Sequence, residues 1–235
     1  MNISNFTARM YFSRPHQTST RAKSSCSTDF SHNVSRMFRL AAILLSVSPI
    51  MAAPTTPAEI AREIIAPLID PTKLDALKGK RAANRRLRLI SYHLETSRRA
   101  GGDPNTIIAQ AQNALGYAET PRAKAVKASL LRNLDILQKL GCLDDAGMGK
   151  LRTGNAPTVT KGPYAGDIAS VDHIIPRSIV EELDERIYNL EFMPSRMNSK
   201  KGNKIGLRQI QLGRKWNRAG LLSDAGLRAV EKAGR

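Results

Sequence analysis

Apolar positions recur with a helical period through the first half of the chain. Leu87, Ile90 and Leu94 fall three and four residues apart. After Pro121 the same period runs through five apolar positions, Ala123, Val126, Leu130, Leu134 and Leu137. Such a period places the apolar side chains on one face of a helix, where they can pack into a core. We therefore expect a helical region over residues 54–152.

Glycines and capping residues divide this region into separate helices. Gly101-Gly102 is expected to end one helix, and Asp103-Pro104 to begin the next with an N-cap and a proline at the first helical position. The segments GCLDDAGM (141–148) and GLLSDAGL (220–227) share this punctuation, because each has a glycine followed by a capping Asp or Ser. The likeness is too short to indicate a duplicated domain.

The pattern changes after Arg152. Residues 153–166 are rich in glycine and proline, which predicts a loop. The β-branched run from Ile168 to Ile175 predicts a strand, and Asn189 to Met193 predicts a second, short one. The residues from Ser195 onward are typical of the start of a helix.

Together these patterns predict a mainly α protein of the α+β class, with a small β-β-α unit. The expected parts are a leader (1–53), a helical region (54–152), a loop or linker (153–166), the β-β-α unit (167–205) and C-terminal helices that pack on it (206–235).

The leader shows no helical period. Residues 1–36 are rich in Ser, Thr and Arg, and residues 37–53 have a basic start, a short apolar run and small residues at the end. This is the layout of a secretory signal peptide, so we expect a secreted or periplasmic protein. The apolar run, Leu40 to Met51, is shorter than the about 20 residues of a membrane span, so we expect no stable membrane insertion. The alternatives are an organelle transit peptide, which the composition of 1–36 also fits, and a cytoplasmic protein that keeps its tail.

Charge narrows the choice of partner. The net charge is +17, most of it beyond residue 53, and 41% of the residues are hydrophobic. A folded protein with such an excess is expected to bind a polyanion, nucleic acid in the first place and an anionic membrane surface in the second. Cys26 and Cys142 stand in unrelated contexts, so we expect neither a disulfide nor a structural zinc.

Three polar residues have the chemistry for hydrolysing a phosphodiester bond. That reaction needs a base to activate water and a cation to offset the charge on the phosphoryl oxygens. Asp172 and Asn198 can give two oxygens to a hard divalent ion, Mg²⁺ or alternatively Mn²⁺, which keeps several of its waters. His173 can take a proton from water near neutral pH.

The stretch Val171 to Lys204 resembles the signature of the HNH endonucleases, whose ββα-metal finger cuts nucleic acid. The matching parts are the Asp-His pair, the Ile-Ile-Pro after it, the Asn-Leu at 189–190 and the Asn at 198. The resemblance implies that Asp172 and Asn198 bind one divalent metal, that His173 is the general base, and that Asn189 braces the loop orienting it. It also implies a metal-dependent endonuclease, with DNA favoured over RNA as substrate.

Basic residues around the motif are expected to contact phosphates without reading sequence, namely Arg177, Arg196, Lys200, Lys201 and Lys204. The acidic residues between the strands are expected to be solvated, namely Glu181, Glu182, Asp184 and Glu185. Two other functions stay open. One is a nucleic-acid-binding protein whose finger does not cleave, and the other is a basic secreted protein acting at anionic membranes.

Overall fold

The computed structural model describes residues 56–72 and 82–235. The expected leader, including the signal-like segment 37–53, lies outside them. The described residues belong to one compact unit, so the helices and the strands that follow them belong together. No helix in the described part of the chain is both long and apolar enough to cross a membrane.

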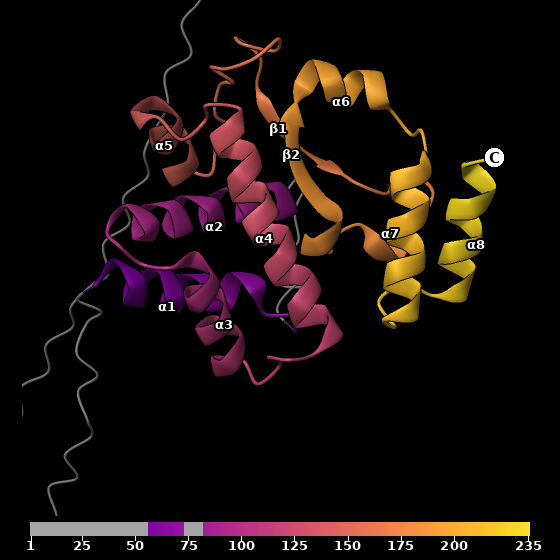
Figure 1. Cartoon of the computed structure of the whole chain (residues 1–235), viewed down its shortest axis with the longest axis horizontal. Coiled ribbons are helices and arrows are strands. Elements are labelled where there is room, and N and C mark those ends of the chain that lie inside the picture. The colour runs from indigo at the N-terminus through magenta and orange to yellow at the C-terminus, as the bar shows by residue number, and fades with distance from the viewer. Residues whose placement is uncertain (1–55, 73–81) are drawn as a thin grey trace, which may run out of the picture. The chain divides into compact units, whose positions relative to one another are not determined.

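The described chain up to residue 152 is helical, as the apolar period predicted. Its helices are α1 (Pro57–Ile69), α2 (Ala82–Arg99), α3 (Pro104–Ala114), α4 (Pro121–Lys139) and α5 (Asp145–Arg152), which Figure 1 shows together. The side chain of Asp103 accepts the first free backbone N–H groups of α3, and Thr120 does the same for α4. These caps satisfy donors that a helix start leaves unpaired.

The apolar stripes form the core. Leu87, Ile90 and Leu94 of α2 are fully buried, and the predicted stripe of α4 is buried with them. Gly101 has a φ of +86°, a left-handed conformation that favours glycine and stops α2. The helix boundaries predicted at Gly101 and Asp103 are therefore confirmed.

The two segments with similar sequences, 141–148 and 220–227, also have similar structures. Asp144 caps α5 and Ser223 caps α8 (Asp224–Ala233), each by accepting the N–H of the glycine three residues on. That glycine lies against the preceding turn, since a Cβ at Gly147 would stand 2.0 Å from the carbonyl oxygen of Cys142. The shared sequence is therefore local helix punctuation.

Two short strands form the sheet of the described chain. β1 (Ala169–His173) pairs antiparallel with β2 (Leu190–Pro194), and Asp172 stands opposite Glu191 in this register. Two short 3-10 helices, Glu181–Leu183 and Ile187–Asn189, lie in the connection. The helix α6 (Ser195–Lys201) follows β2 directly and packs on both strands. The prediction of a mainly α protein with a small sheet is confirmed.

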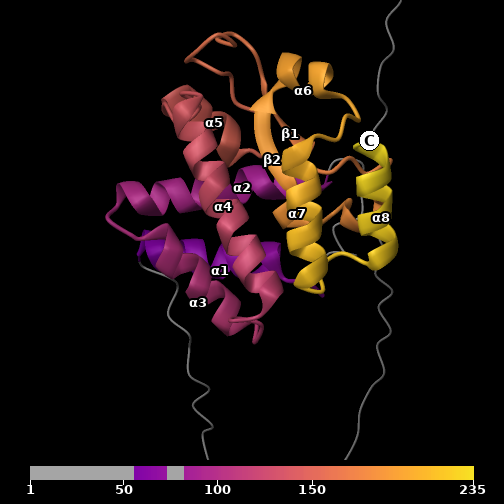
Figure 2. The same ribbon diagram turned by 45° about the vertical axis from the view of Figure 1, so that its right-hand side comes forward.

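Helix α4 lies along the outer edge of β2, as Figures 1 and 2 both show. The buried amide of Asn133 accepts the N–H of Phe192 (2.9 Å) and donates to the carbonyl of Leu190 (3.0 Å). These are the bonds that a third strand would make with β2. One side chain thus covers the strand edge and fixes the sheet to the helical region.

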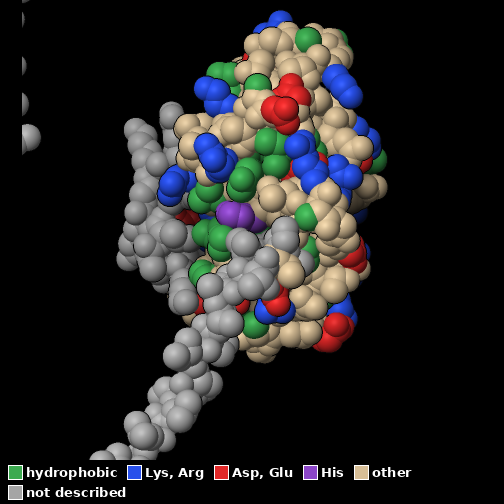
Figure 3. All heavy atoms as spheres, turned by 90° about the vertical axis from the view of Figure 1, so that its left-hand side faces the viewer, with side chains coloured by type: hydrophobic (Ala, Val, Ile, Leu, Met, Phe, Trp, Pro, Cys, Tyr) green, Lys and Arg blue, Asp and Glu red, His purple; other side chains and the backbone are tan. Residues whose placement is uncertain are grey.

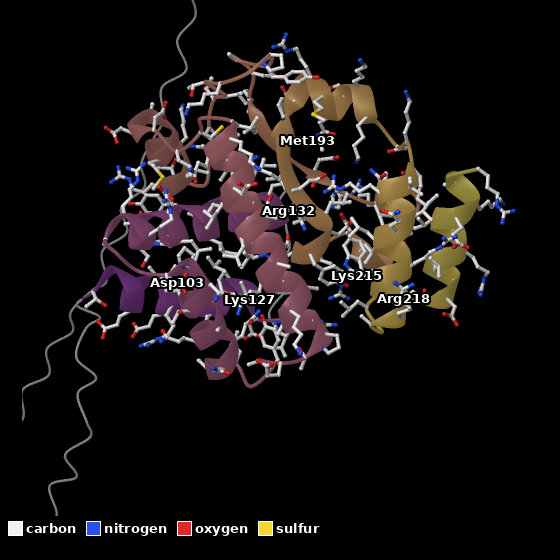
Figure 4. The ribbon with its side chains drawn as sticks, in the orientation of Figure 1. Asp103, Lys127, Arg132, Met193, Lys215 and Arg218 are labelled. Atoms are coloured by element: carbon white, nitrogen blue, oxygen red, sulfur yellow. The ribbon has the colours of Figure 1, made fainter. Side chains whose placement is uncertain are left out.

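The C-terminal helices contact β2 and the connection between the two strands. Arg208 of α7 (Leu207–Arg218) makes a two-point ion pair with the buried Glu191 of β2, at 2.8 and 2.5 Å. Trp216 is buried edge-on against Tyr188, so it packs in the core. Figure 4 shows Arg132, which approaches Glu191 from α4 to 3.9 Å, between that helix and β2.

Candidate active site

The candidate site is built on the last two residues of β1. Asp172 and His173 are neighbours in a strand, so their side chains point to opposite faces of the hairpin. Asp172 shares its face with Glu191 and with the residues that α6 covers. His173 stands at the strand end, where the chain leaves the sheet.

The His173 ring is held by Asp184. Its Nε2 atom lies 2.7 Å from the backbone carbonyl oxygen of Asp184 and 3.0 Å from the carboxylate oxygen Oδ1. Both of these atoms can only accept, so Nε2 is the donor in this pair. In the neutral ring, Nδ1 is then the acceptor, and the side chain is 23% exposed. The arrangement suits a base whose free nitrogen takes a proton from water.

The expectation that the acidic residues between the strands are only solvated is wrong for Asp184. Its carboxylate contacts His173 and also lies 3.6 Å from Arg177. The next carbonyl, that of Glu185, accepts a hydrogen bond from the buried Arg86 of α2 (3.0 Å). Burial lowers the pKa of Arg86 to about 10, and the nearby Glu185 partly offsets this. The segment around Asp184 is thereby tied to the core.

Glu182 is exposed, as expected, but it also has a structural contact. Its carboxylate accepts the hydroxyl and the backbone N–H of Ser223, the residue that caps α8. This contact links the connection between the strands to the C-terminal helix. Glu181 is exposed, as expected.

Asn189 is 0% exposed and clamps the chain just after His173. Its amide accepts the N–H of Ile175 (2.8 Å) and donates to the carbonyls of Ile175 (2.9 Å) and Leu183 (3.2 Å). The carbonyl of Asn189 also accepts the N–H of Ile174 (2.7 Å). These bonds end β1 at His173, whereas the sequence predicted a strand up to Ile175.

Lys201 forms an ion pair with the carboxylate of Asp172. Its Nζ atom lies 2.6 Å from Oδ2 of Asp172 and 2.7 Å from the carbonyl oxygen of His173. Both side chains are 15% exposed. The sequence predicts that Lys201 binds phosphate, and in the structure it is the counter-ion of the expected metal ligand. The other oxygen of Asp172, Oδ1, makes no hydrogen bond or ion pair within the described residues.

Asn198 lies one helical turn before Lys201 and faces the same strand. Its Nδ2 atom is 3.4 Å from the hydroxyl of Ser170, two residues before Asp172. Its side-chain oxygen, Oδ1, accepts no hydrogen bond within the described residues, whereas its backbone oxygen accepts the N–H of Gly202. Asn198 and Asp172 therefore belong to packed elements, α6 and β1, on one face of the hairpin.

The donor set fits a hard divalent ion with few protein ligands. One carboxylate and one amide oxygen, from Asp172 and Asn198, are the type of ligand that Mg²⁺ prefers, and this ion keeps several waters. Within residues 56–72 and 82–235, no three or more His, Cys, Asp and Glu side chains form a group that could hold a metal. The ammonium of Lys201 between two oxygens shows that this point favours positive charge.

The basic residues expected to bind phosphate differ in their surroundings. Lys200 and Lys204 are exposed. Arg177 and Arg196 are also exposed, although each has an acidic neighbour, Asp184 and Asp167. The guanidinium of Arg196 also lies over the ring of Tyr164.

Several residues of the site carry no local sequence signal. Asp184 stands in an acidic run that looks solvated. Asp167 lies before β1, and in the sequence it is far from α6, the helix that it caps. Glu191 looks like the polar residue of an alternating strand, but its partners Arg132 and Arg208 come from α4 and α7. Only the fold brings these groups together.

Comparison with family models, with curated proteins and with solved structures found no match to this chain.

Proposed function

We propose that this chain is a metal-dependent endonuclease of the HNH type that hydrolyses phosphodiester bonds in nucleic acid, DNA in the first place. The proposal rests on the motif residues and on the succession of β1, β2 and α6 that carries them. The observation that carries most weight is the bond from Nε2 of His173 to Asp184, because it leaves Nδ1 as the accepting nitrogen.

His173 is the general base in this proposal. Nδ1 takes a proton from the attacking water, and the resulting imidazolium is stabilised by the carbonyl and carboxylate of Asp184. Asp184 is a positioning residue, since it acts on the ring and fixes its orientation. A general base of this kind contributes about 10²- to 10⁴-fold to the rate.

Asp172 and Asn198 would hold the divalent ion through carboxylate and amide oxygens. When bound, such an ion offsets the negative charge on the phosphoryl group and on the departing 3′-oxygen. Asn189 keeps the chain after His173 in place through its three side-chain hydrogen bonds. The exposed Lys200 and Lys204 hold the phosphate backbone by charge, without reading bases.

A second candidate is a nucleic-acid-binding protein that does not cleave. One observation favours it, since the carboxylate of Asp172 is already neutralised by Lys201. A metal would have to compete with this ammonium. The two candidates therefore differ in whether a divalent ion changes what the protein does to bound nucleic acid.

The test is cleavage by the purified full-length chain. Supercoiled plasmid, single-stranded DNA and RNA are each incubated with Mg²⁺, with Mn²⁺ or with EDTA. We expect nicking with a divalent ion and none with EDTA. Asp172→Asn is expected to abolish nicking, and Asp135→Asn, at an exposed acid on α4, to leave it unchanged. Binding without cleavage under every condition would favour the second candidate, and equal nicking by Asp172→Asn would overturn the metal role.

A further inference from the structure

Lys201 is held inside the candidate site, although it stands in the last turn of a short surface helix. Its neighbour Lys200 is exposed, which is the usual state of a lysine. The ammonium of Lys201 donates to Asp172 Oδ2 at 2.6 Å and to the carbonyl oxygen of His173 at 2.7 Å. Both acceptors are oxygens of the two residues that define the site.

The charges on this face of the hairpin explain the position of Lys201. Asp172 stands opposite Glu191, and two facing carboxylates destabilise a strand pair unless each is compensated. Glu191 has its own cations, Arg208 at 2.5 Å and Arg132 at 3.9 Å. Asp172 has Lys201, its only ion-pair partner within the described residues. Without Lys201, a half-buried carboxylate would lack a counter-ion.

We propose that Lys201 is a resident cation of the Asp172 site, that a divalent ion displaces it, and that the displaced ammonium then binds a substrate phosphate. The inference rests on the proposed function, since it takes Asp172 as a metal ligand. It assigns to Lys201 the phosphate-binding role expected from sequence, but only in the metal-bound protein.

Electrostatics sets the two cations against each other. Even if the divalent ion binds the open oxygen Oδ1, it shares one carboxylate with the ammonium on Oδ2, and the two positive charges repel each other strongly in a partly buried site. The lysine side chain is a flexible stem with a compact charge, so it can leave without moving α6. After the ammonium of Lys201 leaves Asp172, it remains on the same helix as the exposed Lys200. There it can bind a phosphate of the nucleic acid.

Two binding effects follow. Lys201 weakens metal binding, because the ion must first displace it from Asp172. A bound metal strengthens nucleic-acid binding, because it frees one more lysine for phosphate, and by linkage nucleic acid strengthens metal binding equally. Couplings of this kind are typically about 5- to 150-fold in affinity.

The first experiment measures Mn²⁺ binding by isothermal titration calorimetry, without nucleic acid. The full-length wild type is compared with Lys201→Gln, Lys200→Gln and Asp172→Asn. Lys201→Gln removes the charge but keeps a donor for Asp172. Lys200→Gln removes the same charge one residue away and controls for the general electrostatic effect. We expect Mn²⁺ to bind Lys201→Gln about five-fold or more tightly than Lys200→Gln.

The outcomes separate the inference from the proposed function. If the wild type binds Mn²⁺, Asp172→Asn does not, and the two lysine variants bind it equally, the inference is overturned while the metal site stands. If Asp172→Asn binds Mn²⁺ as well as the wild type does, the metal site fails and the inference fails with it.

The second experiment measures duplex DNA binding in the His173→Ala background, which removes the proposed base. Fluorescently labelled duplex is titrated with protein in EDTA and in Mn²⁺. We expect Mn²⁺ to tighten binding, and Lys201→Gln to remove most of this gain while changing affinity little in EDTA. A gain of the same size in the Lys201→Gln variant would contradict the release of Lys201 to phosphate.

Discussion

Asn189 shows how one buried side chain can determine the shape of the candidate site. Its amide pairs with the N–H and carbonyl of Ile175 and with the carbonyl of Leu183, and it has no exposed surface. Its position in the motif led to the prediction that it braces the loop after His173. The hydrogen bonds are those that such a brace would make.

We expect Asn189→Ala to lower the free energy of unfolding by about 3 kcal/mol, because it leaves buried backbone groups unpaired. Urea denaturation followed by circular dichroism measures this value. Asn203→Ala, at an exposed position after α6, is the control and should change it by less than about 0.5 kcal/mol. Equal stability of the two variants would show that the amide bonds of Asn189 do not hold the loop.

Single residues also mark the limit of sequence reasoning at this site. Asp172, His173, Asn189 and Asn198 could be picked out because their order and spacing form a motif. The contact of Asp184 with His173 could not, because it depends on how the connection between the strands folds back. The pairing of Lys201 with Asp172 depends in the same way on how α6 crosses β1.

At the scale of elements, the helices were the most predictable part. Their signals are local, as the buried stripe of α4 and the Asp103 cap of α3 show. The sequence predicted the ends of the two strands to within two residues. The predicted end of β1 is two residues too late, because the chain after His173 is bonded to Asn189, which is distant in sequence. The sequence did not predict that Asn133 would hydrogen-bond to the edge of β2, since a lone Asn in a helix looks like a surface residue.

Helix α6 depends on a cap from outside its own sequence. Pro194 precedes it and has no side chain that can cap, so Asp167 accepts the hydroxyl of Ser195 (2.5 Å) and the N–H of Arg196 (2.9 Å). The bond from the Ser195 hydroxyl, followed by that from Arg196, holds the pKa of Asp167 below its ordinary value of 3.8. Asp167 thus fixes the start of the helix that carries Asn198 and Lys201.

We expect Asp167→Asn to lower the stability of the protein near neutral pH. The folded-state pKa of Asp167 is depressed, so its contribution is present above pH 3.8 and is lost as the pH falls below that value. Guanidinium denaturation at pH 7 and at pH 3 should show a gap between wild type and variant that narrows at pH 3. Asp135→Asn, which breaks an exposed pair with Lys139, should show little change at either pH. A gap for Asp167→Asn that widens at pH 3 would contradict this account.

At the scale of the whole molecule, the positive charge is dispersed. Lys and Arg side chains are scattered over the face in Figure 3, with acidic side chains among them, and Figure 4 shows Lys127 on α4 and Lys215 and Arg218 on α7. The composition predicted a polyanionic partner, but it could not say which cations are free. The structure separates the exposed Lys200 from the paired Lys201.

We expect binding to duplex DNA to weaken steeply with salt, because phosphate contacts release counter-ions. Fluorescence anisotropy over a range of KCl concentrations, in EDTA, gives the slope of log affinity against log salt. Lys200→Ala should reduce this slope by about 1. Lys201→Ala should leave it unchanged in EDTA, since its charge is paired with Asp172. Equal effects of the two variants would show that Lys201 already reaches phosphate without metal.

In the proposed mechanism, His173 activates water for phosphodiester hydrolysis. The most direct test is the single-turnover rate of DNA cleavage in Mg²⁺, measured for wild type, His173→Ala and His93→Gln. His93 is a half-buried histidine on α2, where burial lowers its pKa, and within the described residues it has no hydrogen bond or ion pair with an acidic group. We predict that His173→Ala cleaves about 10²- to 10⁴-fold more slowly with unchanged DNA affinity, and that His93→Gln cleaves at the wild-type rate. Cleavage by His173→Ala at the wild-type rate would contradict the proposed function.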